Sequence, residues 1–518
     1  MSPHLLSLIV GIAVSLGIVT ATQPGEWPSL SLHFTIKRQP MQVYGQSTFT
    51  MTANPVVAIN GSRVLYDATA TFNQDTTTYK YLLSNGVAYL SRSTSGGVST
   101  KCLDSDVLPS INSIVMALNT AAVIASVPEN EGVQCSSGEL YKVSVDGTDF
   151  ALCYSGSAGF TMHGSDMDIV VEYVKTRVDI SVPTMNIDSA NKCALVASSS
   201  ALTPIGSALL TGASIPSTKA RRLKAAFDFS SLKTPPCKCK STPRPCIFIH
   251  GMGIKPEMPE NQQHFPKYWG KLADHAPCCS SMEYARLDTV NNAWTSAAQQ
   301  QKVCDRALAA SKTTQGATIT DTIIITHSMG GLMLSGAIAN GFCGLDSSSS
   351  WLSLGAPMRG SMGSDYTQDA CDGDNGFVLE KFANVTGRCP VSVATRSLAY
   401  EKGDHASAKL NAAYKAAQKV YRTRVTAVAC SNSYSGLLSD YQWQFWMLGK
   451  VVPHKSPQND GMVEFQSCRG GIPESKFGDS YLDPFYVSRV NHFDLQFLSG
   501  DAVLDKSKMP AKWFECVL

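Results

Sequence analysis

Residues 321–331, DTIIITHSMGG, are the stretch that decides the fold of the second half of the chain. A β-branched run ends at Ser328, and two glycines and a helix-forming segment follow. This order is typical of a nucleophile elbow, a sharp strand-to-helix turn that exposes a serine hydroxyl. The usual pattern is G-x-S-x-G, whereas Thr326 here adds a Cβ and a hydroxyl at a crowded turn. Because S-x-G-G alone is common by chance, the elbow needs support from other segments.

The segments around this turn have the alternation of an α/β domain. Short apolar strand-like runs at residues 246–249 and 322–326 alternate with helical windows at residues 292–310 and 332–340. Such alternation is typical of a parallel sheet with crossover helices. We therefore expect residues 246–518 to form a mostly parallel sheet with helices on both faces.

A second strand-to-loop motif precedes the serine. Residues 245–253, PCIFIHGMG, are another buried strand that runs into His-Gly. In an elbow-type hydrolase, the loop after an early strand and the residue after the nucleophile each give a backbone N–H to the oxyanion. The predicted donors are the amides of Met252 and Met329, although ordinary core filling would also explain two methionines.

A general base and the carboxylate that orients it are expected at positions C-terminal to Ser328. Three histidines follow Ser328, and His492, in the loop sequence SRVNHFD, is the predicted base. Asp460, in NDGMV, is the predicted acid that orients the imidazole. The alternatives are Asp404 and Asp440 for the acid and His454 for the base, and a plain turn remains the alternative explanation of Asp460-Gly461.

Taken in order, HGMG, THSMGG, NDGMV and NHFD resemble the secreted bacterial-type triacylglycerol lipases of the α/β-hydrolase superfamily. The resemblance covers roughly residues 245–500 and is more specific for the superfamily than for lipases. It implies an α/β-hydrolase fold, Ser328 as nucleophile, Asp460 as acid, His492 as base, and Met252 and Met329 as oxyanion donors.

The same resemblance raises the question of calcium, because members of that family hold a structural calcium near the loop of the catalytic histidine. Asp440 and Asp494 lie where two carboxylate ligands would match. The family's glutamine six residues after the histidine is replaced by Leu498. Calcium is therefore a possibility to which we do not commit, and we expect no other cofactor or metal.

In the first half of the chain, apolar residues recur at every second position, which is the period of a β-strand rather than of a helix. Apolar and polar residues alternate over residues 30–37, and strand-like runs follow at 47–52, 63–72, 77–83 and 87–90. Asn85-Gly86 and Asp146-Gly147 predict two-residue hairpin turns. Residues 111–123 predict one helix. We expect a β-rich antiparallel domain over residues 22–194, in which His33 and His163 have solvated or hydrogen-bonded roles.

Between these halves, residues 195–245 have the Ser-, Thr-, Ala- and Pro-rich composition of a linker. Arg221-Arg222 is a processing site or, as we favour, an exposed basic patch. Cys237 and Cys239 lack a metal-site spacing, so we expect them to tie the linker to a neighbouring domain.

The N-terminus predicts export. Residues 5–19 form an uncharged apolar run, shorter than a membrane span, followed by Val19-Thr20-Ala21. We expect a signal peptide over residues 1–21, no later membrane span, and a secreted chain. All sixteen cysteines lie beyond residue 21 and are then best explained as disulfides. Asn60 and Asn384 begin glycosylation sequons.

The charge and the aromatic content of the sequence limit the binding partners that we expect. The formal net charge of +2, from 43 Lys and Arg against 41 Asp and Glu, gives no field that would attract nucleic acid. Residues 441–449, YQWQFWMLG, are apolar and aromatic, and predict either a lid or acyl-binding surface or a packed amphipathic helix.

We therefore expect a secreted serine hydrolase that cleaves carboxylic esters, with lipid esters as the preferred substrates and a lipid interface as one place of action. The alternatives are a lipid or glycolipid deacylase or acyltransferase on the same triad, and a non-catalytic surface-binding protein whose active part is the β-rich half.

Overall fold

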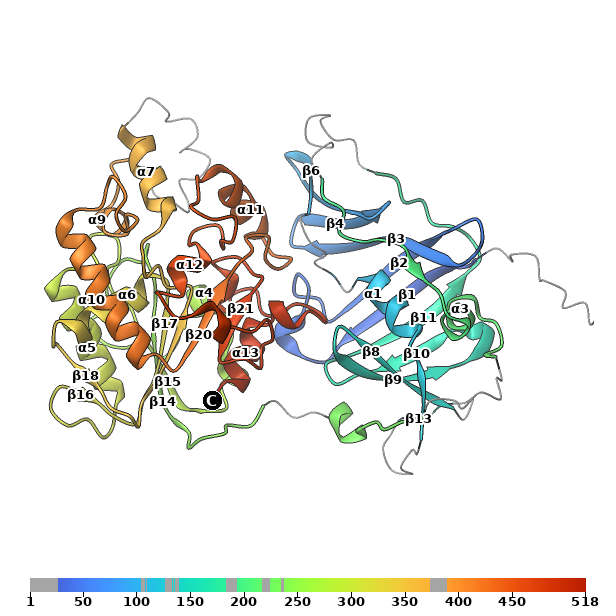
Figure 1. The fold of residues 1–518 in the computed structure, drawn as a ribbon, viewed down its shortest axis with the longest axis horizontal. Helices are drawn as coiled ribbons and strands as arrows, with labels where there is room; N and C mark the ends of the chain where they lie inside the picture. Colours follow the sequence, from blue (N-terminus) through green and yellow to red (C-terminus); the bar gives the residue numbers. More distant parts are fainter. Residues whose placement is uncertain are drawn as a thin grey trace, which may run out of the picture.

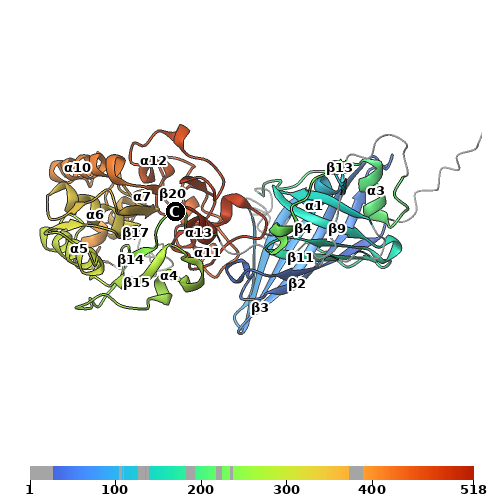
Figure 2. The same cartoon turned by 90° about the horizontal axis from the view of Figure 1, so that it is seen from below.

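The fold has a β-rich half and an α/β half that lie side by side (Figures 1 and 2). A computed structural model describes residues 27–103, 108, 110–125, 133, 135, 139–182, 193–216, 224–233, 237–372 and 389–518. The expected signal peptide, the Arg221-Arg222 pair and the sequon at Asn384 lie outside the described residues.

The β-rich half is built on one large antiparallel sheet. Its strands are β1 (Ser29–Ile36), β2 (Thr48–Val57), β3 (Arg63–Gln74), β4 (Thr77–Ser84), β5 (Val87–Thr94), β6 (Gly97–Cys102), β7 (Ala122–Ile124), β8 (Leu140–Val145), β9 (Thr148–Tyr154), β10 (Phe160–His163), β11 (Met167–Val174), β12 (Ser200–Ala201) and β13 (Lys224–Ala225). They follow the order β13-β7-β8-β9-β10-β11-β1-β2-β3-β4-β5-β6, with β12 beside β3; only the β13–β7 edge pair is parallel. The antiparallel fold predicted from period two is confirmed.

The two predicted hairpin turns are present. Asn85 and Gly86 have φ of 50° and 80°, and Asp146 and Gly147 have φ of 47° and 76°. Positive φ at both central residues is the type I′ geometry, which matches the twist of the flanking strands.

The helix predicted over residues 111–123 is too long. Helix α1 (Ile111–Leu118) ends before Asn119, and Val123 in β7 pairs with Tyr141 in β8. Thr203 explains the ending, because its backbone N–H donates to Asn119 Oδ1 at 2.9 Å and its hydroxyl donates to the Asn119 carbonyl at 3.1 Å. These tertiary hydrogen bonds compete with continuation of the helix.

Part of the predicted linker packs on the β-rich half. Helix α3 (Pro204–Thr211) is capped by the Thr203 hydroxyl and begins with proline. Leu209 and Leu210 are fully buried in the same core as α1. Residues 200–211 therefore belong physically to the sheet rather than to a free tether.

The α/β half contains a six-stranded parallel sheet in the order β15-β14-β17-β19-β20-β21. Its strands are β14 (Arg244–Ile249), β15 (Cys279–Ala285), β17 (Ile323–His327), β19 (Ser350–Leu354), β20 (Ala427–Ser431) and β21 (Phe485–Ser488), with the short pair β16 (Thr318–Ile319) and β18 (Gly344–Leu345) outside it. The helices are α4 (Pro266–Trp269), α5 (Ala297–Ala310), α6 (Met329–Ala339), α7 (Met362–Asp372), α9 (Val393–Arg396), α10 (Ala408–Arg424), α11 (Gln442–Val451), α12 (Phe465–Cys468) and α13 (Pro510–Cys516).

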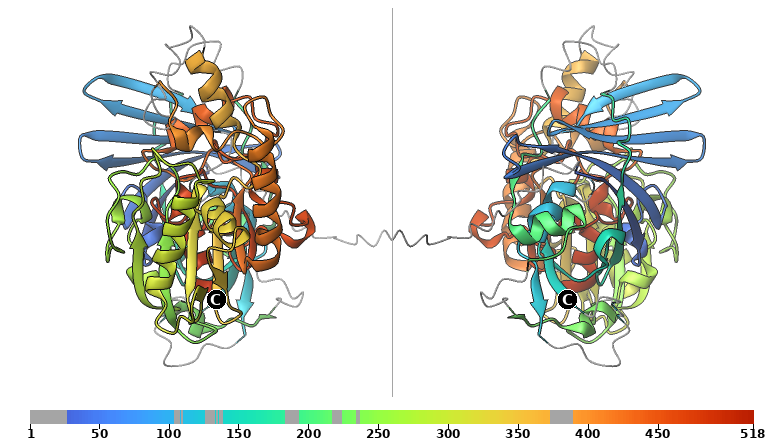
Figure 3. Two further views of the ribbon diagram at one scale, coloured as in Figure 1. Left: turned by 90° about the vertical axis from the view of Figure 1, so that its left-hand side faces the viewer. Right: turned by 90° about the vertical axis from the view of Figure 1, so that its right-hand side faces the viewer.

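Helices cover both faces of this sheet, as expected. Ile247 and Ile249 of β14 share a core with α5, α6 and α10, which lie in front of the strands in the left panel of Figure 3. Phe248 of the same strand faces the other way and packs on Trp269 of α4 and Phe514 of α13. Because β14 and β17 are buried on both sides, residues 245–249 and 323–325 are uninterrupted apolar runs.

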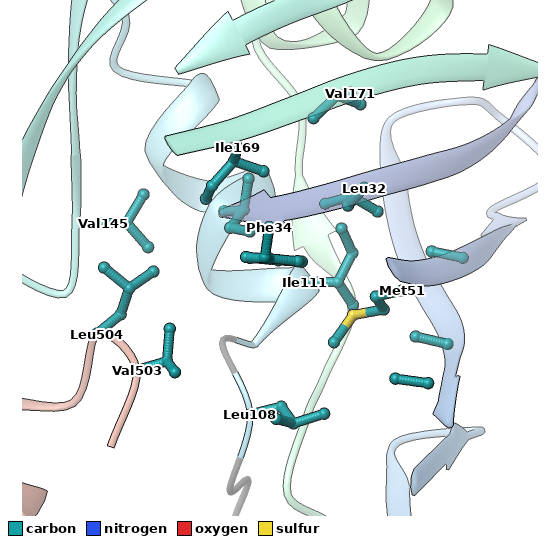
Figure 4. Packing of buried hydrophobic residues seen from close by; sticks show 14 of the residues in the cluster. Leu32, Phe34, Met51, Leu108, Ile111, Val145, Ile169, Val171, Val503 and Leu504 are labelled. Carbon is teal, nitrogen blue, oxygen red and sulfur yellow. The ribbon is translucent and has the colours of Figure 1, made fainter. Parts of the chain in front are cut away.

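The two halves share buried contacts. Val503 and Leu504, from the end of the chain, lie in the core of the β-rich half beside Val145 (Figure 4). Arg38 of the β-rich half forms ion pairs with Asp501 at 3.2 Å and with Glu515 at 2.7 Å.

All sixteen cysteines are paired in eight disulfides. Cys102–Cys193 and Cys135–Cys153 close within the β-rich half, and the other six close within residues 237–516. Cys237–Cys516 and Cys239–Cys278 tie the end of the linker to the α/β half, as expected. So many disulfides indicate an oxidising compartment. Within the described part of the chain, no helix is long and apolar enough to cross a membrane.

Candidate active site

Ser328 stands at the turn between strand β17 and helix α6, with φ of 54° and ψ of −129°. Such a conformation is strained for a residue with a side chain and is the backbone geometry of a nucleophile elbow. The Ser328 amide donates to the Leu354 carbonyl of β19 at 2.9 Å, and this hydrogen bond holds the turn. Gly330 must be small, because a Cβ there would lie 2.5 Å from the Ile249 carbonyl oxygen.

Thr326, the departure from the usual elbow pattern, is accommodated by a neighbouring strand. Thr326 is fully buried. The indole N–H of Trp351, on β19, donates to the Thr326 hydroxyl at 2.9 Å. The threonine therefore supplies the acceptor that a buried tryptophan N–H requires.

The structure brings Ser328, His492 and Asp460 together. His492 Nε2 lies 2.9 Å from Ser328 Oγ, and His492 Nδ1 lies 2.7 Å from Asp460 Oδ2. The second oxygen of Asp460 accepts hydrogen bonds from the amides of Met462 and Val463 at 2.9 and 2.7 Å. Because these amides fix the carboxylate, its free oxygen can hold the imidazole with Nδ1 protonated and Nε2 facing the serine.

Two of the alternatives, His454 and Asp440, have other partners, as does His405, the neighbour of Asp404. His454 is paired with Glu464 at 2.8 Å, and His405, which follows Asp404, is paired with Asp369 at 2.8 Å. Asp440 accepts a hydrogen bond from Tyr79 of the β-rich half. In that half, His33 contacts Thr50 and His163 contacts Asp168, in agreement with the hydrogen-bonded roles expected for both histidines.

The loop that follows β14 passes close to the serine. A Cβ on Gly251 would lie 2.6 Å from the Ser328 Cβ, so only glycine allows this approach. Thr289 fixes the loop: its hydroxyl donates to the Gly251 carbonyl at 2.8 Å, and its carbonyl accepts from the Gly253 amide at 3.1 Å.

This anchoring leaves the two predicted oxyanion donors free to act. Within the described residues, the Met252 amide has no protein acceptor. Met329 is the first residue of α6, where a backbone N–H has no partner within the helix. Both amides are available to a substrate oxygen, and the helix N-terminus adds a favourable dipole.

Hydrogen bonds of the buried Tyr268 and His327 link this loop to His492. Tyr268 Oη accepts from the Gly251 amide at 2.7 Å and lies 2.6 Å from His327 Nδ1. His327 Nε2 lies 3.0 Å from the His492 carbonyl oxygen. His327 directly precedes Ser328 within THSMGG, but Tyr268 lies on α4 and no sequence motif marks it.

The protonation of this network follows from its partners. Burial, aided by the nearby His492, lowers the pKa of His327 well below its ordinary value, so His327 is neutral. A carbonyl oxygen can only accept, so His327 Nε2 carries the proton and Nδ1 accepts from the Tyr268 hydroxyl. The hydrogen bonds therefore form one continuous chain, in which Gly251 donates to Tyr268, Tyr268 donates to His327, and His327 donates to the carbonyl of His492.

A cavity of about 240 Å³ opens at the serine. Its walls carry the apolar side chains Met252, Ile254, Leu398, Met462, Val463, Phe493 and Leu498 around Ser328 and His492. Lys267, Ser361 and Gln496 also line it, so the cavity is mostly apolar with a few polar groups, which is common in ligand pockets.

Helix α11 borders this cavity. Phe445 and Leu448 are buried, and the Phe445 ring lies 4.7 Å from that of Phe493, next to His492. Tyr441, which directly precedes the helix, lines the cavity, whereas Trp443 and Trp446 are half-buried on another side. The segment is thus a packed amphipathic helix, and a lid movement stays a prediction.

The two carboxylates considered for calcium are engaged by protein donors. Asp440 accepts from Tyr79, and Asp494 Oδ2 accepts from the Leu437 and Asn491 amides at 2.8 and 3.2 Å. Burial raises the pKa of Asp494 to about 6. Across the described residues, no three His, Cys, Asp or Glu side chains gather as metal ligands. Asp494 Oδ1 and Gln496 Oε1 are nevertheless buried without a hydrogen-bond partner among the described residues. We derive no step through a cation.

A comparison of the chain with protein-family models and with curated proteins finds no match.

Proposed function

We propose that the chain is a secreted serine hydrolase that cleaves carboxylic esters, with lipid esters as the first candidates. The observation that carries the proposal is the hydrogen-bonded series Ser328, His492 and Asp460, in which Ser328 follows strand β17 and His492 follows strand β21 of the parallel sheet. Export is supported by the expected signal peptide and by the eight disulfides.

The chemistry follows from the protein's own groups. Ser328 Oγ attacks the ester carbonyl carbon while His492 Nε2 takes its proton. Asp460 stabilises the resulting imidazolium. His492 then gives the proton to the leaving alcohol oxygen as the C–O bond breaks, and an acyl-enzyme remains. Water, activated by His492, releases the acid.

The amides of Met252 and Met329 are placed to stabilise the oxyanion that forms during both steps. Loss of one such donor costs about 3 kcal/mol of transition-state stabilisation in comparable enzymes. The apolar walls of the cavity favour an apolar acyl group.

The test is labelling of the intact protein by a fluorophosphonate probe, followed by rates with an activated ester. We expect Ser328 to be labelled and Ser328→Ala to lose activity by on the order of 10⁶-fold. Ser335→Ala is a matched control, because Ser335 is a buried serine on the same helix α6. Equal labelling of the intact protein and Ser328→Ala would disprove the assignment. Product analysis with competing alcohols separates hydrolysis from acyl transfer.

A further inference from the structure

A second cavity, of about 470 Å³, lies between the two halves of the chain. The β-rich half contributes Gln42, Tyr44 and Gln74, and the α/β half contributes Asp440 and residues 497–500. No step of the mechanism above uses this space.

The second cavity and the cavity at Ser328 have two lining residues in common. Tyr441 and Leu498 line both spaces. Phe497 and Leu498 lie five and six residues after His492, so the second cavity lies against the segment that carries the proposed general base.

The position of His492, the proposed general base, decides which part of an ester substrate faces the second cavity. His492 must give its proton to the alcohol oxygen as the ester bond breaks, so the alcohol leaves past the imidazole. The acyl carbonyl points instead toward the amides of Met252 and Met329. An ester seated for reaction therefore directs its alcohol group toward the second cavity.

The lining of the second cavity is half apolar, with Leu272, Leu438 and Phe497 among its residues, and its polar half is nearly neutral in charge. Three glutamines, Gln39, Gln42 and Gln74, face it together with Ser439. Lys271 is its one cationic lining residue and is balanced by Asp440. Amide and hydroxyl groups donate and accept hydrogen bonds in the way that hydroxyl groups require, whereas a phosphate would need a cluster of cations.

We infer that the cavity between the two halves binds the alcohol part of the substrate, and that this alcohol is a neutral, hydroxyl-rich group such as glycerol or a sugar. The inference rests on the proposed function and gives the β-rich half a role in choosing the substrate.

The experiment uses the full-length protein and octanoate esters of ethanol, glycerol and glucose, which share one acyl chain. The double variant Gln42→Leu/Gln74→Leu removes two side-chain amides from the cavity while preserving their approximate size. We expect kcat/KM for the glycerol and glucose esters to fall at least about tenfold and kcat/KM for the ethyl ester to stay unchanged. Gln46→Leu is the matched control, because Gln46 lies on the same loop as Gln42 but does not line the cavity.

Three results would overturn the inference. The first is an equal loss of activity on all three esters, and the second is no loss on any. The third is a change that depends on acyl length in a second series of ethyl esters, because it would place the acyl chain in the cavity. If neither the wild type nor any variant hydrolyses any ester in a Ser328-dependent way, the proposed function itself fails.

Discussion

The hydroxyl of Tyr79, on strand β4 of the β-rich half, donates a hydrogen bond to Oδ1 of Asp440, two residues before helix α11. Leu438, in the same segment, is buried in the core of the β-rich half. The ammonium of Lys101, on β6, lies 5.0 Å from the ring centre of Trp443 on the helix itself. The β-rich half thus contacts, at three positions, the segment around Tyr441, which lines the cavity at Ser328.

This contact predicts that Tyr79→Phe loosens helix α11. Loss of the hydrogen bond should lower the free energy of local opening by about 1 kcal/mol. Amide hydrogen exchange over residues 437–448 should become faster, while exchange in α5 and α6 stays unchanged.

Tyr141→Phe provides the control, since it removes another tyrosine–carboxylate hydrogen bond of the same sheet, to Glu139 at 2.8 Å. If both variants change exchange in α11 equally, the contact at Asp440 does not restrain the helix.

The hydrogen bonds of Tyr268 lead to a second prediction. Tyr268→Phe keeps the ring in its aromatic cluster but disconnects the Gly251 amide from His327. The loop that carries Gly251 and Met252 and the backbone of His492 then lose their common support, and kcat should fall about 10- to 100-fold with little change in KM. Steady-state kinetics with a p-nitrophenyl ester measures both constants.

The control is Tyr284→Phe, because Tyr284 stacks on Phe248 at 4.9 Å in the adjoining core. A role of Tyr268 in stability alone would lower the melting temperature without lowering kcat of the folded enzyme.

The sequence correctly predicted the strands and turns that depend only on neighbouring residues. Period two predicted the sheet strands, Asn85-Gly86 predicted a turn, and the β-branched run before Ser328 predicted the central strand. Residues outside any local pattern were missed: Tyr268 acts through hydrogen bonds to segments that are distant in sequence. The predicted end of helix α1 was wrong for a related reason, because the helix ends at hydrogen bonds between Asn119 and the distant Thr203.

Thr326 offers a third prediction, which opposes the one that the sequence pattern alone would suggest. Thr326→Gly restores the usual elbow pattern, yet it removes the acceptor of the buried Trp351 N–H. We expect the free energy of unfolding to fall by about 3 kcal/mol, with no gain in kcat. Chemical denaturation and ester kinetics check the two parts.

Thr326→Ser retains the hydroxyl and should lose less than half as much stability. A glycine variant that is more active and equally stable would show that Thr326 is a defect in the elbow rather than a support of it.

The ion pairs of Arg38 give a fourth prediction, which depends on pH. Two buried carboxylates, Asp501 and Glu515, share this one guanidinium. Burial raises the pKa of Asp501 from its ordinary 3.8 to about 6, whereas hydrogen bonding to His275 and the charge of Arg38 lower the pKa of Glu515. Between pH 4 and 6 the folded chain therefore keeps a proton on Asp501 that the unfolded chain releases, and this contribution to stability is lost as pH rises through about 6.

Arg38→Leu should consequently be more harmful at high pH. At pH 8 both carboxylates are charged, and removal of their cation should lower the free energy of unfolding by roughly 3 to 5 kcal/mol. At pH 5 Asp501 is mostly neutral and needs no cation, so the loss should be clearly smaller. Denaturant titrations at both pH values test this difference, with the exposed Arg63→Leu as a control that should change little at either pH. An equal loss at pH 5 and pH 8 would mean that Arg38 stabilises the junction by packing rather than by charge.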